Sequence, residues 1–348
     1  MKKNEVHNLA RTSIAQLQPY SSARDEFTDF ELDMVFLDAN ENPFSTDVNR
    51  YPDPQQRDVK SLLAAQKGIT ASKILLGNGS DEVLDLLFRA FCEPNVDNVI
   101  TLPPTYGMYK VLADINAIEN REVLLSTNFE PKVLEILKIQ DEKSKLLFLC
   151  SPNNPTGNTF SEASILRLLE EFNGLVVIDE AYIDFSETDS WLNKLKKYHN
   201  LVITQTLSKA YGMAGIRLGI CYASEEIIAL LNKIKPPYNI NELTQQRAFE
   251  RLVNIEDVSN EVEHILEEKT SVSKQLLEIP FIEKIYPSEA NFILVKVDDA
   301  TKRYTQLLKQ GIVVRNRSNQ PLCENTLRLT IGTSAENKKL IKSLQKII

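Results

Sequence analysis

The sequence contains no long apolar run. None of its 348 residues lies in an uninterrupted apolar stretch of about 20, the length that a membrane-spanning helix requires. The N-terminal stretch MKKNEVHNLARTSIAQ also lacks the apolar core of a signal peptide. We therefore expect no membrane segment and a cytoplasmic protein.

Cysteine and histidine are scarce as well. The four cysteines are scattered along the chain: Cys92, Cys150, Cys221 and Cys323. None belongs to a C-x-x-C pair, a pattern that suits a reducing cytosol better than a disulfide framework. The chain has three histidines, and none falls at a spacing typical of metal ligands, so we expect no metal site.

Positive charge is in deficit. Lysine and arginine total 40 residues against 48 aspartates and glutamates, which gives a net charge of −8. This balance argues against a nucleic-acid-binding surface. The length favours two domains rather than one.

Strand-like and helix-like patterns alternate between residues 73 and 223. KILLGNGS is followed by the helical DEVLDLLFRAFC, DNVITL by YGMYKVLADI, and KLLFLC, after a turn-rich loop, by SILRLLEEF. GLVVIDEAY, NLVITQT and GIRLGICYA supply further strands. These unbroken apolar runs predict an α/β fold with a mostly parallel sheet covered by helices. Polar side chains cluster just after the strands, where ligands bind in such sheets.

The pattern changes after KPPYNIN, whose prolines end a helix. A long charged helical stretch, VEHILEEKTSVSKQLLEI, leads into short strands and helices that indicate a smaller α+β unit. We therefore expect a large domain over residues 31–250 and a small C-terminal domain over 251–348. An N-terminal segment, residues 1–30, is expected to join the small domain.

The stretch QTLSKAYGMAGIRLG places Lys209 among hydroxyls and a fixed positive charge. Thr206, Ser208 and Arg217 are the residue types that bind a phosphate group. A lysine beside such a phosphate could form a Schiff base with an aldehyde on the same ligand. The simpler alternative is a lysine on a solvated loop.

Asp179 follows a fully apolar strand in VVIDEAY. A carboxylate at that position costs free energy unless a cation meets it, and a protonated pyridine nitrogen would be such a cation. Tyr182 could then reach a phenolic oxygen on the same ring. An acid that only caps the end of a strand is the alternative.

Three further loops carry polar or aromatic side chains. In SPNNPTG, Asn154 could bind a ring oxygen, although the loop also has the composition of a plain turn. In GNGSDE, the N-terminus of a helix could bind a second side of the phosphate, or Ser80 could serve only as an N-cap. Tyr106 could stack on an aromatic ring or simply pack in the core. Pyridoxal 5'-phosphate carries the phosphate, aldehyde, phenolic oxygen and pyridine nitrogen that these loops could bind.

With these motifs the chain resembles the fold-type I pyridoxal-phosphate enzymes of the aspartate-aminotransferase superfamily. The narrower motifs LDANENPF, NRYPDP, PPTYGMY, VVIDEAYIDF, TLSKAYGMAGIRLG and LRLTIGT are similar to those of the histidinol-phosphate aminotransferases. The resemblance implies three catalytic residues: Lys209, Asp179 and Tyr182. It implies that the cofactor is surrounded by Ser80, Asp81, Tyr106, Asn154, Asp179, Tyr182, Thr206, Ser208, Lys209 and Arg217, with Tyr51 reaching it from the other subunit of a homodimer.

The resemblance also implies a substrate site. Its residues would be Tyr20, Asn42, Asn239, Arg315 and Arg328. Arg317 lies two residues from Arg315 and would face the same way on a strand, so either could be the second arginine.

The expected reaction is transfer of an amino group between L-histidinol phosphate and 2-oxoglutarate, with L-glutamate as the other amino acid. A threonine-phosphate decarboxylase or an aromatic or broad-range aminotransferase on the same scaffold are alternatives. A regulator that senses pyridoxal phosphate is a remoter one, because only about 36 residues precede LDANENPF, too few for an added DNA-binding domain.

Overall fold

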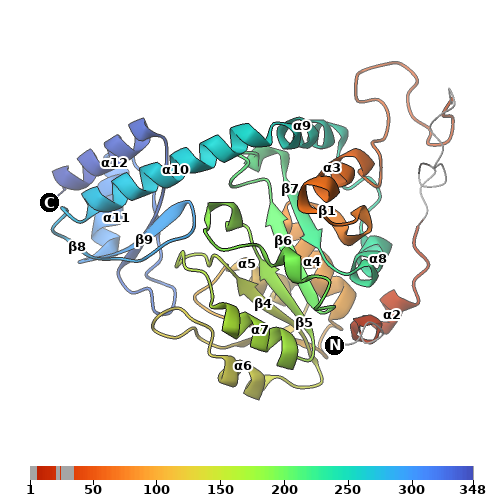
Figure 1. The fold of residues 1–348 in the computed structure, drawn as a ribbon, viewed down its shortest axis with the longest axis horizontal. Coiled ribbons are helices and arrows are strands. Elements are labelled where there is room, and N and C mark those ends of the chain that lie inside the picture. The colour runs from red at the N-terminus through yellow and green to blue at the C-terminus, as the bar shows by residue number, and fades with distance from the viewer. Residues whose placement is uncertain (1–5, 21–23, 25–34, 348) are drawn as a thin grey trace.

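The computed structural model describes residues 6–20, 24 and 35–347. Its strands form a seven-stranded and a four-stranded sheet, which lie beside each other and are linked by the long helix α10 (Figure 1). The larger sheet contains β1 (Ile74–Asn78), β2 (Asn98–Thr101), β3 (Glu119–Glu122), β4 (Ser144–Cys150), β5 (Leu175–Asp179), β6 (Leu201–Thr206) and β7 (Leu218–Tyr222). The smaller contains β8 (Ile282–Ile285), β9 (Phe292–Val297), β10 (Arg315–Asn316) and β11 (Thr326–Thr330).

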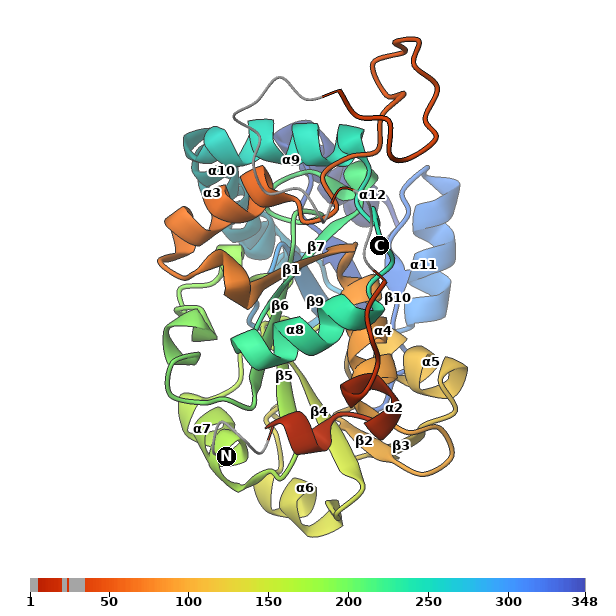
Figure 2. The same ribbon diagram turned by 90° about the vertical axis from the view of Figure 1, so that its right-hand side faces the viewer.

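Helices cover both faces of the larger sheet and one side of the smaller one (Figures 1 and 2). The α-helices are α2 (Thr12–Ala15), α3 (Arg57–Lys67), α4 (Ser80–Phe91), α5 (Met108–Ile115), α6 (Val133–Ile139), α7 (Glu162–Glu171), α8 (Glu225–Ile234), α9 (Glu242–Val253), α10 (Ile255–Leu276), α11 (Ala300–Lys309) and α12 (Ser334–Lys346). Short 3-10 helices are η1 (His7–Leu9), η3 (Ala71–Lys73), η4 (Ile183–Phe185), η5 (Trp191–Lys194) and η6 (Ala214–Ile216). None of the helices in these described ranges is long and apolar enough to cross a membrane.

The larger sheet is parallel except for one strand. Its order is β1-β7-β6-β5-β4-β2-β3, and only β7 runs against its neighbours. A parallel crossover needs about a dozen residues or more and usually a helix. The loop over residues 207–217 holds only the short η6, so β7 returns antiparallel to β6. This confirms the predicted α/β class with a mostly parallel sheet.

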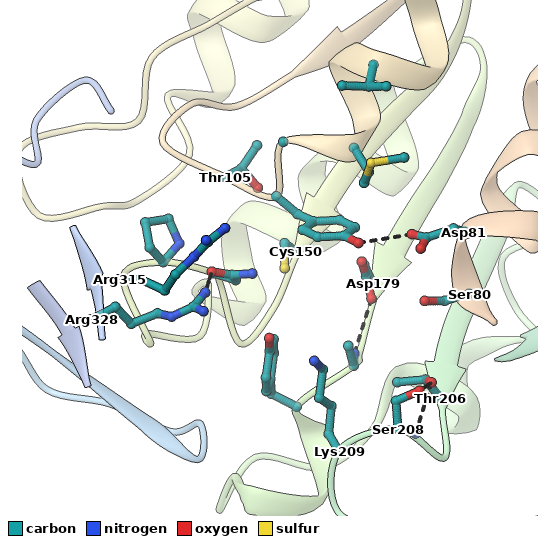
Figure 3. Close-up of a pocket in the computed structure, with 18 of the residues that line it drawn as sticks. Ser80, Asp81, Thr105, Cys150, Asp179, Thr206, Ser208, Lys209, Arg315 and Arg328 are labelled. Carbon is teal, nitrogen blue, oxygen red and sulfur yellow. Dashed lines mark hydrogen bonds between the residues drawn. The ribbon is translucent and has the colours of Figure 1, made fainter. Parts of the chain in front are cut away.

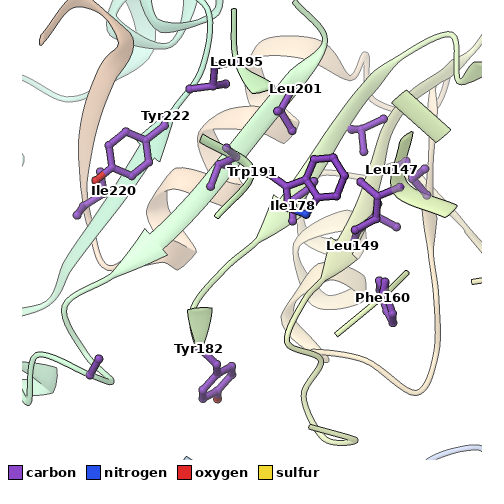
Figure 4. Close-up of a cluster of buried hydrophobic side chains, with 14 of the residues drawn as sticks. Leu147, Leu149, Phe160, Ile178, Tyr182, Trp191, Leu195, Leu201, Ile220 and Tyr222 are labelled. Atoms are coloured by element: carbon purple, nitrogen blue, oxygen red, sulfur yellow. The ribbon is translucent and has the colours of Figure 1, made fainter. Parts of the chain in front are cut away.

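The central strands are buried on both faces, which explains their unbroken apolar runs. In β5, Val176 and Ile178 point into one core with α3, α7 and α9, whereas Leu175 and Val177 point into the other with α4, α5 and α8. Figure 4 shows the first of these cores around Ile178 and Leu201. Each fully buried aliphatic side chain contributes about 1.5–3 kcal/mol, so β5 is held firmly up to its last residue, Asp179.

The smaller sheet is antiparallel in the order β10-β11-β9-β8 and packs against α10, α11 and α12 over its own apolar core. In α12 the N-cap Thr333 and Glu336 form a capping box. This arrangement agrees with the α+β unit expected for the C-terminal part. The exact division of the chain at residue 250 stays a prediction.

The described part of the N-terminal segment packs on α4 and α8, two of the helices that cover the larger sheet. Val6 is buried with α4 and α8, and Arg11 donates its backbone N–H to Ala90 O at 2.9 Å and a side-chain N–H to Arg89 O at 3.1 Å. Lys233 Nζ donates to Ala15 O at 2.7 Å. These contacts differ from the expected docking on the small domain, because Arg11 binds carbonyls that the end of α4 leaves unpaired. Residues 1–5, 21–23 and 25–34 of that segment lie outside the described residues.

Candidate active site

A cavity of about 470 Å³ opens at the carboxyl ends of β4, β5 and β6 and reaches across to the smaller sheet (Figure 3). It is lined by most of the residues that the sequence singled out: Ser80, Asp81, Tyr106, Asn154, Asp179, Tyr182, Thr206, Ser208, Lys209, Arg217, Arg315 and Arg328. Segments separated by about 250 residues of sequence therefore meet here. The size suits a small-molecule ligand.

Asp179 is the acid at the end of β5, and its side chain is only 3 % exposed. Tyr109 on α5 donates its hydroxyl to Asp179 Oδ2 at 2.7 Å, and the backbone N–H of Ala181 donates to Oδ1 at 3.2 Å. Burial raises the pKa of Asp179, although these hydrogen bonds act in the opposite direction. Within the described chain, Asp179 forms no ion pair, so a cationic ring nitrogen would supply what this carboxylate lacks.

Lys209 lies in the loop after β6, and its Nζ is 5.6 Å from the centre of the Tyr182 ring. The side chain is accessible from the cavity, yet the surrounding protein removes enough water to lower its pKa. The positive charge of Arg328 lowers the pKa of Lys209 further, while Asp179 opposes the shift. A lowered pKa increases the fraction of neutral amine, the form that attacks an aldehyde.

Hydroxyls, an arginine and a helix N-terminus converge on the side of the cavity that lies away from the smaller sheet (Figure 3). Ser208 donates its backbone N–H to Thr206 Oγ1 at 3.1 Å, and Arg217 lies 4.0 Å from Asp81. Helix α4 begins at Ser80 after Gly79, and no side chain caps its first N–H groups. Ser80 is therefore not an N-cap, and the free amides suit an anion.

Thr206, Ser208, Arg217 and the N-terminus of α4 at Ser80 form what we call the anion cradle, and two glycines allow them to pack together. A Cβ on Gly79 would lie 2.5 Å from Arg217 Nη2, and a Cβ on Gly219 would lie 2.2 Å from the backbone nitrogen of Ser80. Both contacts are far closer than side chains tolerate, so β7, Arg217 and the start of α4 pack together only because the side chains are absent. Together with the unpaired acid and the accessible lysine, this cradle fits pyridoxal 5'-phosphate.

The residues expected beside the cofactor ring are held by contacts on different sides of the cavity. Tyr106 donates its hydroxyl to Asp81 Oδ1 at 3.0 Å and meets Tyr109 edge-on, with ring centres 5.5 Å apart. Tyr182 is buried and packs edge-on against Phe292 of the smaller sheet. Asn154 accepts a hydrogen bond from Arg328 through its Oδ1. Figure 3 shows Arg315 and Arg328 on the side of the cavity that faces the smaller sheet.

Four expected site residues are not in this cavity. Tyr20 and Asn42 are exposed, and Asn42 Oδ1 accepts from the backbone N–H of Phe44. Tyr51 stacks on Tyr238, with ring centres 4.5 Å apart, in a separate hollow. The first three lie in segments that extend away from the cavity of their own chain.

Asn239, the fourth, lies behind the start of α4. Its Nδ2 donates to Leu76 O at 3.0 Å and to Glu82 Oε2 at 2.8 Å, while Lys235 donates to its Oδ1. The observed contacts are those of a residue that anchors the loop before α9 to β1 and α4.

The cavity also contains residues that sequence reasoning missed or left open. Thr105, Cys150, Arg317 and Gln320 line it, and Tyr109 holds Asp179 from behind. The available signal was the spacing of Tyr109, three residues after Tyr106 within the helix-like stretch YGMYKVLADI, although α5 itself begins only at Met108.

The whole arrangement matches known proteins. A family model described as aminotransferase class I and II matches residues 26–344. The histidinol-phosphate aminotransferase of Flavobacterium johnsoniae is 65% identical over 346 residues, which cover 99% of this chain and 99% of the relative.

Solved structures share the fold. The crystal structure of the histidinol-phosphate aminotransferase from Clostridium acetobutylicum superposes with a TM-score of 0.80 at 25% identity and covers 86% of this chain and 91% of its own. That from Sinorhizobium meliloti, in complex with pyridoxal 5'-phosphate, gives a TM-score of 0.79 at 20% identity and covers 87% and 85%.

Proposed function

The chain belongs to the class I and II aminotransferases and, within them, to the histidinol-phosphate aminotransferases, and from this we propose that it transfers an amino group between L-histidinol phosphate and 2-oxoglutarate. The products are imidazole-acetol phosphate and L-glutamate, and the reaction belongs to histidine biosynthesis. The single observation that carries the proposal is the cavity that brings Lys209, Asp179, an anion cradle and two arginines together.

The cofactor is pyridoxal 5'-phosphate, which supplies an aldehyde that bonds to amines and a ring that accepts an electron pair. Ser80, Thr206, Ser208 and Arg217 bind its phosphate at the start of α4. Asp179 holds a proton on the pyridine nitrogen, and its buried position makes this pairing strong. Other contacts with the ring come from Asp81, Tyr106, Asn154 and Tyr182.

Lys209 is the residue that binds the aldehyde and moves the proton. Its Nζ points into the cavity, and its lowered pKa makes the amine a better proton carrier than an ordinary surface lysine. Tyr182, whose ring lies beside Nζ, orients the amine.

Arg315 and Arg328 bind the anionic end of each substrate. They face each other across β10 and β11 and lie in the same cavity wall. A planar guanidinium binds both phosphate and carboxylate oxygens in pairs, so the same wall serves the phosphate ester and the dicarboxylic acids. Residues 31–250 would then hold the cofactor, and residues 251–348 would supply these two arginines.

The proposed assembly is a homodimer in the cytosol. Apolar side chains are exposed along residues 35–51, among them Leu37 at 88 % and Phe44 at 77 %, and on α9 at Leu243 and Phe249. Surfaces of this kind favour a protein interface. On such an interface Tyr51 would reach the cofactor phosphate of the partner, and Tyr20 and Asn42 would reach substrate. The four buried free thiols are compatible with a reducing compartment.

Lys209→Ala tests the proposal directly. We expect turnover of histidinol phosphate and 2-oxoglutarate to fall on the order of a thousandfold or more, because both the bond to the aldehyde and the proton carrier are removed. Wild-type protein should show a visible absorption band that histidinol phosphate bleaches and 2-oxoglutarate restores. The matched control is Lys132→Ala, a surface lysine paired with Glu135, which should behave as wild type.

Two results would contradict the proposal. One is near wild-type turnover by Lys209→Ala. The other is release of CO2 from threonine phosphate by the wild-type protein without amino transfer, which would make it a decarboxylase instead.

A further inference from the structure

Arg317 is a third arginine in the cavity wall, beside Arg315 and Arg328. Its backbone N–H donates to Thr326 O at 2.9 Å and so extends the pairing of β10 with β11 by one residue. Side chains alternate along a strand. Asn316, between the two arginines, donates to Thr301 on α11, so Arg315 and Arg317 share the opposite side, which faces the cavity.

The guanidinium of Arg317 is half-buried and forms no hydrogen bond or ion pair with the residues that the structure describes. Its Nε is fully buried and donates to no acceptor in the described ranges, and the same holds for Arg328 Nε. Within those ranges, none of the three arginines pairs with a carboxylate. Buried N–H donors without acceptors cost free energy, which an anionic ligand would recover.

The three positive charges also repel one another. Arg315 lies directly opposite Arg328 in the strand register. Burial, together with the charges of Arg328 and Arg315, lowers the pKa of Arg317 to about 10. Like charges placed across a strand pair are destabilising. A wall with three cations therefore binds best a ligand that carries more than one negative charge.

We propose that Arg317 sets the preference of this site for a doubly charged phosphate ester over a singly charged carboxylate group. The inference rests on the proposed function, whose substrates present both groups to the same wall. Coulomb energy scales with the charge of the ligand, so one fixed cation stabilises a dianion about twice as much as a monoanion. Because affinity is exponential in free energy, removing that cation weakens dianion binding by about the square of the factor for the monoanion.

The test is the binding of methyl phosphate and acetate to cofactor-loaded protein, measured by titration calorimetry. A pH of about 8 keeps methyl phosphate doubly charged, since the second pKa of a phosphate monoester is about 6. For Arg317→Gln we expect Kd to rise about fivefold for acetate and about 25-fold for methyl phosphate. KM for histidinol phosphate should rise more than KM for glutamate.

Two variants serve as controls. Arg317→Lys keeps the charge, so the two ligands should lose affinity by similar factors. Arg167→Gln removes an exposed arginine that pairs with Glu171 on α7 and should change neither Kd.

Equal losses for the two ligands in Arg317→Gln, or no loss, would overturn the inference. The inference would also be overturned if, in Arg317→Lys, the factor by which Kd rises for methyl phosphate were the square of the factor for acetate. This second result can be measured even if Arg317→Gln does not fold. Turnover of histidinol phosphate by the wild-type protein tests the proposed function separately, because it does not depend on the ratio between the variants.

Discussion

At the scale of single residues, the hydrogen bond between Tyr109 and Asp179 determines how the acid at the end of β5 behaves. The Tyr109 ring is fully buried and stacks on Phe148, with ring centres 4.8 Å apart, so its hydroxyl is held in place. This donor lowers the pKa of Asp179 against the opposing effect of burial. Tyr109 thus acts as a positioning residue that favours the ionised carboxylate and directs it at the cavity.

We expect Tyr109→Phe to reduce kcat about tenfold, because a hydrogen bond to a charged group is lost. Without the donor the pKa of Asp179 rises. Activity that needs the ionised acid disappears as pH falls through that pKa, so the acid limb of the kcat profile should move to higher pH. Steady-state kinetics across pH, with the absorption spectrum recorded at each point, would measure the shift.

Tyr222→Phe provides the comparison for this variant. Tyr222 is also fully buried, but its hydroxyl has no hydrogen-bond partner in the described chain, so its removal should leave the acid limb in place. An acid limb that stays in place in Tyr109→Phe as well would show that the hydroxyl does not control Asp179.

Local sequence context identified Lys209, Asp179 and Arg217 in the cavity, but not the residues that contact or surround such charged groups. Lys209, Asp179 and Arg217 stood in unusual surroundings that needed a ligand to explain them. Tyr109 looked ordinary, since a tyrosine in an amphipathic helix is common, and Arg317 was expected only as an alternative to Arg315, not as a third arginine beside it. Their roles depend on which partner they face, and that is decided by packing between segments far apart in the chain.

At the scale of elements, the apolar period predicted most of the central strands and the helices between them. Strand β3, Glu119–Glu122, was missed because ENRE contains no apolar residue and pairs only at the sheet edge. The long helical stretch expected over residues 262–279 begins earlier, at Ile255, and ends at Leu276. Edge strands and helix ends bury little surface, so the sequence specifies them weakly.

The meeting of β7 with the start of α4 leads to a prediction at this scale. Gly219→Ala would place a Cβ 2.2 Å from Ser80 N and 2.3 Å from the backbone carbon of Gly79. Backbone atoms in a sheet and a helix start move little, so we expect unfolding free energy to fall by about 3 kcal/mol. Because α4 must move away from Arg217, affinity for pyridoxal 5'-phosphate should fall too. Urea denaturation and cofactor titration of the apoprotein would measure both.

Gly215→Ala is the matched substitution in the neighbouring loop. A Cβ there meets no atom within 4 Å, so stability should change by no more than about 0.5 kcal/mol. If the two variants were equally stable, close packing of β7 on α4 would not be what requires Gly219.

At the scale of the whole molecule, the cavity is built from both sheets, yet one chain leaves it open on one side. Tyr51 lies in a separate hollow of its own chain, and the segment that carries it exposes apolar side chains instead of burying them. A sequence specifies contacts within a chain and between chains by the same residue types. Residue patterns alone therefore could not assign Tyr51 to the partner's site, and only the resemblance of NRYPDP to related enzymes implied it.

The proposed homodimer can be tested by mixing two variants, Lys209→Ala and Tyr51→Phe. Each removes one cofactor contact, and in a symmetric dimer the two contacts of one site come from different chains. In a hybrid dimer one site then carries both substitutions and the other carries neither. Random exchange of equal amounts should leave about a quarter of all sites intact.

Titration of the mixed apoproteins with pyridoxal 5'-phosphate, followed by absorbance, would count these sites. We expect about a quarter of the chains to bind with wild-type affinity and to recover turnover, although neither variant alone does so. As a control, each variant taken alone through the same exchange procedure should recover no sites with wild-type affinity. If the hybrid mixture also recovered none while sedimentation showed that subunits had exchanged, Tyr51 would not act on the partner's cofactor, and the exposed surface along residues 35–51 would need another occupant.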